Sequence, residues 1–131
     1  GGENIEITAA YPIDSDGEPE QMLRTAFHNE YEEFDSIYPA FGETARQEGF
    51  TEIANAFFSI AAIEKTHGDR FLRIADHIAG DRLFRGESAQ PFLCLNCGHV
   101  HNGATAPLVC PVCHHDQGYY VRLSLAPFMG E

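Results

Sequence analysis

Apolar residues recur at steps of three and four positions along two long segments, which is the period of an α-helix that faces a core. The first pattern predicts a helix that begins near Pro19 and stops at Gly49. Pro39 lies inside it, and because the pattern continues beyond this residue we expect a kinked helix there. The second pattern predicts one helix over residues 50–78, ending at Gly80.

Both apolar stripes carry polar side chains at their centre. The first comprises Leu23, Ala26, Glu30, Glu33, Ile37 and Phe41, and the second comprises Phe57, Ile60, Glu64, His67, Phe71 and Ile74. An unpaired charge that faces a core is costly, and coordination of a metal is one way to offset that cost. A Glu-x-x-His pair projecting into a helix bundle is the ligand pattern of di-iron carboxylate sites. A capped or water-bridged core pair is the simpler interpretation of Glu64 and His67 taken alone.

The two helices supply only half of such a site. A complete bundle takes a Glu from each of two helices and a Glu-x-x-His from each of the other two, and the sequence offers no third or fourth helix of this kind. The carboxylate-rich ligand set favours iron or manganese over zinc. We therefore expect other helices to complete the bundle and its metal site.

The four cysteines form the stronger local signal. Cys94-x-x-Cys97 and Cys110-x-x-Cys113 are separated by twelve residues, which suits two knuckles that together bind one metal through four thiolates. Zinc and a single iron both fit a tetrahedral thiolate site, and a zinc ribbon that only folds the module is an open alternative. Paired cysteines with none elsewhere indicate a reducing compartment, so the cytoplasm is expected.

The remaining segments complete the domain organisation. Residues 1–18 are expected to be an extended connection with a short strand at 5–8, and residues 19–80 the helical half-bundle. Residues 81–91 contain Gly and Pro and are expected to be a linker, and residues 92–131 form the metal domain. The chain starts Gly-Gly without Met, which suggests either a tag remnant or an internal point of a longer polypeptide.

Composition excludes several classes of partner. The chain has 131 residues and a formal net charge of −12, with 20 Asp and Glu against 8 Lys and Arg. Without a basic run, binding to nucleic acid or to an anionic membrane surface is not expected. No apolar run approaches the length of a membrane span.

The residues that carry these patterns resemble the rubrerythrin family. Segments 29–41, 48–50 and 62–67 resemble the second helical pair of rubrerythrins, and segment 92–113 is similar to their rubredoxin-like domain. The resemblance implies an α+β fold: a ferritin-like di-iron helical bundle, with only two long helices in this chain, followed by a small rubredoxin-like tetrathiolate β domain.

The resemblance also implies roles for individual residues. Glu30 and Glu33 match the paired helical glutamates, of which one is a standing ligand and the other moves on or off an iron with redox state. Glu64 matches a bridging or terminal glutamate, His67 a histidine ligand, and Tyr38 an aromatic residue able to hydrogen-bond a ligand. The ligands of a mononuclear Fe(Cys)4 site would be Cys94, Cys97, Cys110 and Cys113.

The function implied by the resemblance is peroxide reduction. Hydrogen peroxide would be reduced to water at the di-iron site, with electrons relayed through the thiolate iron from an external donor, either rubredoxin or an NAD(P)H-dependent reductase. Rubrerythrins begin with two further helices that this chain lacks. Three explanations are open. A separate N-terminal fragment supplies these helices, which is the explanation we favour, or a second copy of the chain in a homodimer supplies them. In the third, the helical site stays empty.

A rival interpretation belongs to another class. The chain would then be a non-catalytic zinc-ribbon protein whose helical hairpin serves protein–protein interaction. That interpretation predicts a colourless, zinc-loaded protein without a response to peroxide. Iron storage or ferroxidase activity is a third and weaker alternative, because nothing in the sequence indicates a cage-forming bundle.

Overall fold

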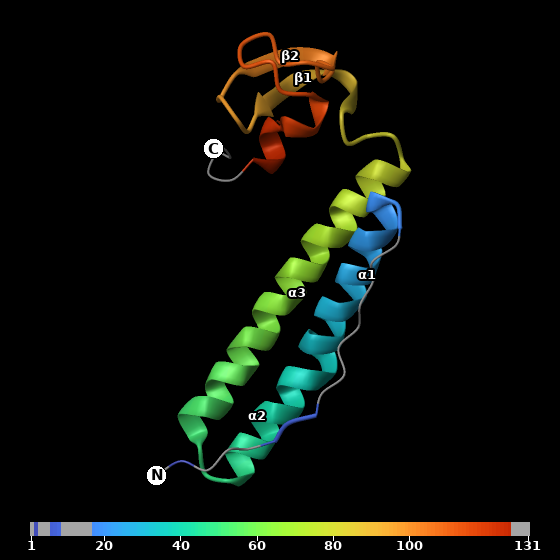
Figure 1. Cartoon of the computed structure of the whole chain (residues 1–131). Helices are drawn as coiled ribbons and strands as arrows, with labels where there is room; N and C mark the ends of the chain where they lie inside the picture. Colours follow the sequence, from blue (N-terminus) through green and yellow to red (C-terminus); the bar gives the residue numbers. More distant parts are fainter. Residues whose placement is uncertain (1, 3–5, 9–16, 127–131) are drawn as a thin grey trace.

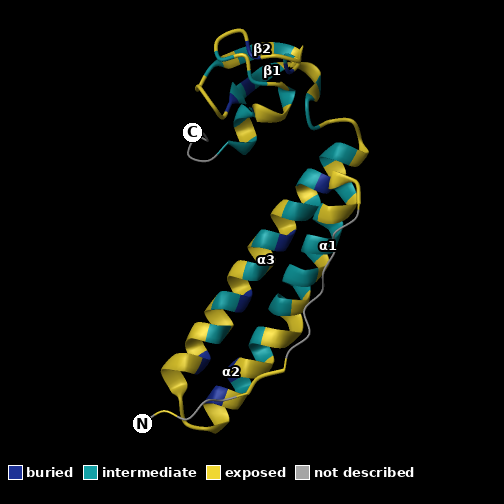
Figure 2. Cartoon of the chain, viewed as in Figure 1, coloured by how far each residue is buried: buried dark blue, intermediate teal, exposed yellow. Residues whose placement is uncertain are grey.

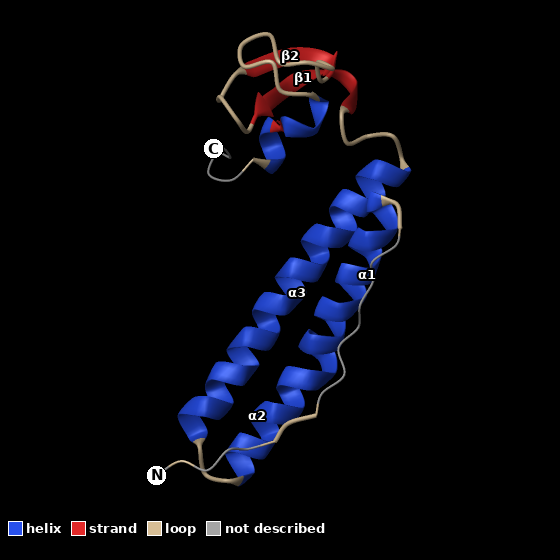
Figure 3. Ribbon diagram, viewed as in Figure 1, coloured by secondary structure: helices blue, strands red, loops and turns tan. Residues whose placement is uncertain are grey.

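The computed structural model describes residues 2, 6–8 and 17–126 and contains two parts, a helical hairpin and a small sheet (Figures 1 and 3). The hairpin runs up one long interrupted helix and returns along a second. Its elements are α1 Pro19–Glu32, the π-helix η1 Glu33–Ile37, α2 Tyr38–Gln47 and α3 Thr51–Ala79. The α+β fold expected from the sequence is confirmed. The predicted strand at 5–8 is not formed by residues 6–8, and Ile5 lies outside the described residues.

The first long helix continues through Pro39, as predicted, but by a route that the sequence did not indicate. The chain forms a π-helix at η1, in which the N–H of Tyr38 bonds to the carbonyl of Glu33. Pro39 then occupies the first turn of α2, where its missing N–H costs little. The hairpin turns at Gly49, whose φ of +87° lies in the left-handed region that favours glycine.

Small residues bring the two long helices together. The buried positions of α3 are Ala54, Ala61, Gly68 and Ala75, spaced seven apart along one face. Figure 2 shows them as isolated buried positions on a largely half-buried or exposed helix. Ala54 and Ala61 are buried, whereas Ala56 and Ala62 of the same helix are exposed.

The sheet is antiparallel, in the order β2-β1-β3. Its strands are β1 Arg85–Cys94, β2 Val100–Thr105 and β3 Tyr120–Arg122. Phe92 sits at the centre, opposite His101 on one side and Arg122 on the other, and is fully buried. The core of this module consists of Phe92, Cys94, Ala106, Cys110 and Tyr120.

The linker expected over residues 81–91 is shorter than predicted, because β1 begins at Arg85. The register of β1 against β2 shifts between Arg85 and Gln90, so the segment around Gly86 is accommodated as an irregularity of the strand. Pro91 pairs with β2 and has no partner in β3. Its missing N–H therefore removes no hydrogen bond on the side of β1 that faces β3.

The sheet lies beyond the C-terminal end of α3 (Figure 1). Arg122 of β3 donates hydrogen bonds to the carbonyls of Arg82 and Arg85, which fasten the connecting segment to the sheet. No helix in the described part of the chain is long and apolar enough to cross a membrane.

Candidate metal centres

The helical hairpin brings three of the predicted ligands together. Glu30 comes from α1, and Glu64 and His67 come from α3; their ligand atoms all lie within 4.8 Å of one another. His67 Nδ1 is 2.7 Å from Glu64 Oε2 and 3.4 Å from Glu30 Oε2. The two carboxylate side chains are 13% and 22% exposed, against 40% for the imidazole, so the oxygens lie deeper than the ring.

The electrostatics of this group favour a bound cation. Burial raises the pKa of Glu30, and its hydrogen bond and charge interaction with Glu64 raise it further, while His67 acts in the opposite direction. Two carboxylates that share one small region repel each other unless a proton or a metal lies between them. Two oxygen ligands and one imidazole suit iron and fit one part of a dinuclear carboxylate site.

Glu33 and Tyr38 lie beside this group without joining it. Burial raises the pKa of Tyr38, and the negative charges of Glu33, Glu64 and Glu30 add to the effect in that order. The Tyr38 ring meets Phe41 edge-on, with ring centroids 6.4 Å apart. Tyr38 is therefore placed among the predicted ligands, but Glu33 does not reach the cluster that the other three form.

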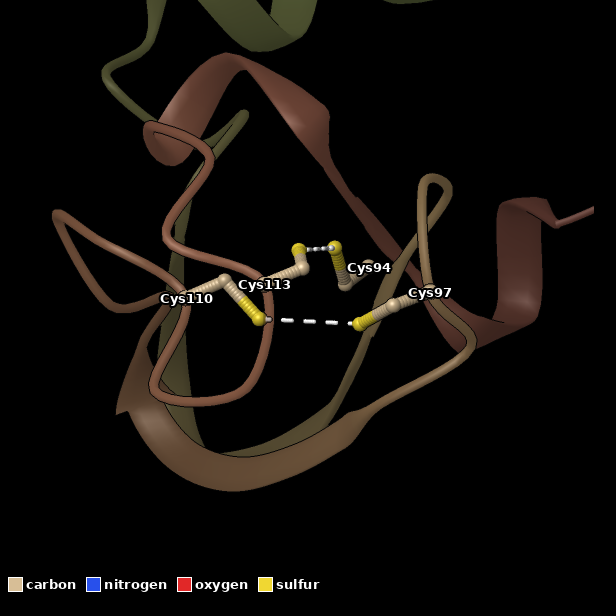
Figure 4. A group of neighbouring side chains, drawn as sticks. All are labelled: Cys94, Cys97, Cys110 and Cys113. Atoms are coloured by element: carbon tan, nitrogen blue, oxygen red, sulfur yellow. Dashed lines mark hydrogen bonds between the residues drawn. The ribbon is translucent and has the colours of Figure 1, made fainter.

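The four cysteines converge in the sheet module (Figure 4). Cys94 Sγ lies 3.7 Å from Cys113 Sγ, and Cys97 Sγ lies 3.7 Å from Cys110 Sγ. Four thiolates at about 2.3 Å from a tetrahedral metal are separated by about 3.8 Å, so these distances fit one ion. All four thiols are free, and the geometry therefore supports a metal site rather than disulfides.

Each cysteine pair is shaped by a turn with a residue of positive φ. The N–H of Gly98 bonds to the carbonyl of Cys94, and the N–H of His114 bonds to that of Cys110, at the corresponding position. Their φ values are +79° and +62°. A hydrogen bond from the backbone of the second turn, at His115, lowers the pKa of the Cys113 thiol to about 5. At Cys113 the backbone thus favours the thiolate form that a metal requires.

Sequence reasoning missed Tyr120, which lies beside this centre. Its side chain is 3% exposed, and its hydroxyl has no hydrogen-bond partner within the described part of the chain. Burial raises the pKa of Tyr120, and neighbouring Cys110 raises it further. Its place beside Cys110 depends on how the second cysteine turn folds against β3, which no local sequence pattern indicates.

Family models match the two regions of the chain that hold these candidate centres. The rubrerythrin family matches residues 10–92, and the family described as rubrerythrin, rubredoxin-like domain matches residues 92–121. The chain is 40% identical over 119 residues to a rubrerythrin of Clostridium perfringens, covering 91% of this chain and 61% of that protein. It is 39% identical over 124 residues to a rubrerythrin of Nitratidesulfovibrio vulgaris, covering 95% and 65%.

Among solved structures, nigerythrin in a partially reduced state gives a TM-score of 0.48 at 23% identity, covering 88% of this chain and 55% of that one. The chain spans less than two thirds of the length of the relatives named above. With 40% identity and a family match over most of its residues, the chain belongs to the rubrerythrin family.

Proposed function

We propose that this chain takes part in the reduction of hydrogen peroxide to water. Breaking the O–O bond consumes two electrons and two protons and yields two molecules of water. The observation that carries the proposal is the group formed by Glu30, Glu64 and His67 across the two long helices of a rubrerythrin-family chain. In the relatives this would be a di-iron carboxylate site, and iron bound there would supply the electrons.

The chain's own residues have distinct roles in this proposal. Glu30 and Glu64 hold the cation with hard oxygen ligands, and His67 adds a neutral nitrogen. Glu33 is half-buried on the same helical segment and, in this proposal, would swing toward the site when the charge there increases. Tyr38 keeps its proton, since burial and the surrounding carboxylates raise its pKa, and can donate a hydrogen bond to a ligand.

The thiolate centre would relay electrons. Cys97 is exposed while Cys94 and Cys110 are buried, so the site has one side open to an external donor such as rubredoxin or an NAD(P)H-dependent reductase. Four thiolates held by the backbone of two turns change little in geometry when a bound iron changes its charge, which suits electron transfer. We propose that this iron serves the helical site of a partner chain in a head-to-tail dimer.

Further helices are needed to complete the carboxylate site. The apolar stripes that flank the ligands are only half-covered: Phe57, Ile60, Phe71 and Ile74 are all of intermediate exposure, and Phe41 is 50% exposed. Two additional helices packed on these stripes would bury them and bring the remaining ligands. A complementing N-terminal fragment or a second copy of the chain would supply these helices. We place the protein in the reducing cytoplasm, where its free thiols can hold metal.

The test compares two glutamate variants from the same helix. Glu64→Ala removes a ligand, whereas Glu52→Ala changes an exposed residue in the first turn of α3. The iron-loaded, reduced chain, assembled with its complementing helices, should consume peroxide. Glu64→Ala should abolish that turnover, and Glu52→Ala should retain it. The visible absorption of the thiolate iron should survive in both variants. A colourless zinc protein, or full turnover by Glu64→Ala, would refute the proposal.

A further inference from the structure

A cavity of about 430 Å³ lies between the C-terminal end of α3 and the sheet module. Arg82, Arg85 and Arg122 all line it, which gathers three of the chain's 8 Lys and Arg residues in one place. The chain as a whole has a net charge of −12, so this concentration of guanidinium groups departs from the rest of the molecule. Such a cavity is suited to an anion.

Three of the residues that line the cavity carry a buried nitrogen atom without a hydrogen-bond partner. His77 Nδ1, Gln90 Nε2 and Arg122 Nε are buried and have no hydrogen-bond partner within the described part of the chain, and all three residues line the cavity. The Gln90 and Arg122 nitrogens can only donate, and His77 Nδ1 donates in one tautomer. Buried donors without acceptors are costly, so their grouping points to a ligand that supplies acceptor oxygens.

The basic groups are held in place before any ligand binds. Arg122 donates to the carbonyls of Arg82 and Arg85, and Arg82 donates to the carbonyl of Asp76 at 3.3 Å. These contacts use carbonyl oxygens and do not neutralise the guanidinium charges of Arg82 and Arg122. Backbone anchoring of this kind reduces the entropy lost when a ligand is bound.

The acidic residues in the lining compete only weakly with an anion. Asp81 pairs with Arg85 at 2.9 Å, but the two side chains are 78% and 63% exposed. Exposed ion pairs contribute little, because water screens them. Glu87 is exposed as well and makes no ion pair with the described residues.

We infer that this cavity binds a phosphate oxyanion. The planar donor fork of arginine matches the oxygens of phosphate, and several such donors meet here. The cavity is larger than phosphate alone requires and falls within the range of small-molecule sites, so the phosphate can belong to a phosphorylated small molecule. None of the metal ligands lines the cavity, and the inference does not depend on the proposed peroxide chemistry.

The experiment titrates the zinc-loaded full chain with inorganic phosphate, following heat release and the NMR signals of the arginine side chains. Arg82→Gln removes a lining charge, and Gln90→Leu removes an unpaired donor without changing charge. Arg46→Gln is the matched control, since Arg46 is exposed, pairs with Glu43 on α2 and lies outside the cavity lining. A parallel titration with adenosine monophosphate separates the two sources of phosphate.

The expected result is saturable binding that shifts the Arg122 Nε–H signal. Arg82→Gln should weaken binding about tenfold and Gln90→Leu several-fold, while Arg46→Gln leaves the Kd unchanged. Tighter binding of adenosine monophosphate would identify a phosphorylated organic ligand, and equal binding would identify the free oxyanion. Shifts that never saturate, or equal weakening by Arg82→Gln and Arg46→Gln, would overturn the inference.

Discussion

At the scale of single residues, the two cysteine turns have the same backbone conformation but use different residues at the position with positive φ. Both turns need a residue with positive φ immediately after the second cysteine of the pair. The first turn uses Gly98, and the second uses His114. The left-handed conformation costs an L-residue about 1–2 kcal/mol, whereas glycine adopts it freely. The second turn therefore carries backbone strain that the first avoids.

Replacing the glycine should transfer that strain to the first turn. Gly98→Ala should destabilise the metal-loaded sheet module by about 1–2 kcal/mol, because φ at this position is +79°. No atom of the described residues lies within 4 Å of an added Cβ, so the cost is conformational rather than steric. Thermal unfolding followed at the sheet resonances measures it. His114→Gly should act in the opposite direction, and equal losses in both variants would contradict this account.

His77 should make the stability of the chain depend on pH. Burial lowers its pKa, the charges of Arg122, Arg82 and Arg73 lower it further, and only Asp76 opposes them. The folded state therefore favours the neutral ring. Below the ordinary value of 6.5 the unfolded chain binds more protons, so the free energy of unfolding falls as pH decreases through 6.5 toward the lowered pKa.

Chemical denaturation between about pH 7 and about pH 5 checks this dependence. His77→Gln should flatten the decline in stability, since the substituted side chain does not titrate. His28→Gln removes an exposed histidine of α1 and serves as the control. A wild-type slope in His77→Gln would show that other groups cause the acid sensitivity.

At the scale of elements, the contact between α1 and α3 depends on one glycine facing one aromatic ring. The Tyr31 ring lies over Gly68, and its hydroxyl donates to Asp69 at 2.6 Å. The ring also packs against Phe27, with centroids 4.5 Å apart. It cannot move aside without losing these contacts, and so Gly68 sets the distance between the helices that carry Glu30 and the Glu64–His67 pair.

Gly68→Ala should therefore destabilise the hairpin even though alanine is the better helix former. An added Cβ would lie 2.6 Å from a ring carbon of Tyr31, and overpacking of this kind costs about 1–3 kcal/mol. Thermal unfolding measured by far-ultraviolet circular dichroism gives the change. Adding Tyr31→Leu should recover part of the loss. A stabilised Gly68→Ala chain would mean that propensity outweighs packing here.

The elements also show where sequence reasoning succeeds. Two helix boundaries were predictable because Pro19 and Gly49 act locally, through a fixed φ and a left-handed turn respectively. Gly80 also follows the last residue of α3, but its φ is −88° and the left-handed residue at this end is Asp81. The π-helix was not predictable, because backbone hydrogen bonds between residues five apart require no particular residue type. The start of β1 was missed because Gly86 and Pro91 resemble a linker, while strand pairing is decided by β2.

The candidate sites follow the same rule. Spacing placed Glu64 and His67 on one face of α3, and the cysteine pattern identified all four thiolates. Spacing alone could not distinguish Glu30, which reaches His67, from Glu33, which does not, because that depends on the packing of the helices. Tyr120 and the arginine-lined cavity were invisible for the same reason: they join residues from distant parts of the chain.

At the scale of the whole molecule, the helical hairpin and the sheet have separate cores. The buried positions of the hairpin are Ala and Gly, while the sheet module is built around Phe92 and two of its own cysteines. A module this small rarely folds on hydrophobic burial alone, and a structural metal commonly supplies the difference. Metal binding and folding of the sheet should therefore be coupled, and the hairpin should be independent of both.

Cys110→Ala should release the thiolate metal and abolish the dispersed signals of the sheet while the helical signal remains. Cys110 is fully buried and belongs to the core as well as to the site. Val112→Ala, at a position 60% exposed between the two cysteines of the same turn, should keep metal and sheet. Two-dimensional NMR and metal analysis distinguish these outcomes. Loss of the helices together with the sheet would refute the independence of the two parts.

The most direct test of the account is the iron content of the purified chain, compared with that of Glu64→Ala. The account predicts that wild-type chain, with its complementing helices present, holds iron in two kinds of site. Glu64→Ala should lose the helical iron and retain about one iron per chain, bound by the four thiolates. Equal iron in both proteins, or zinc alone, would contradict a carboxylate iron site on these helices.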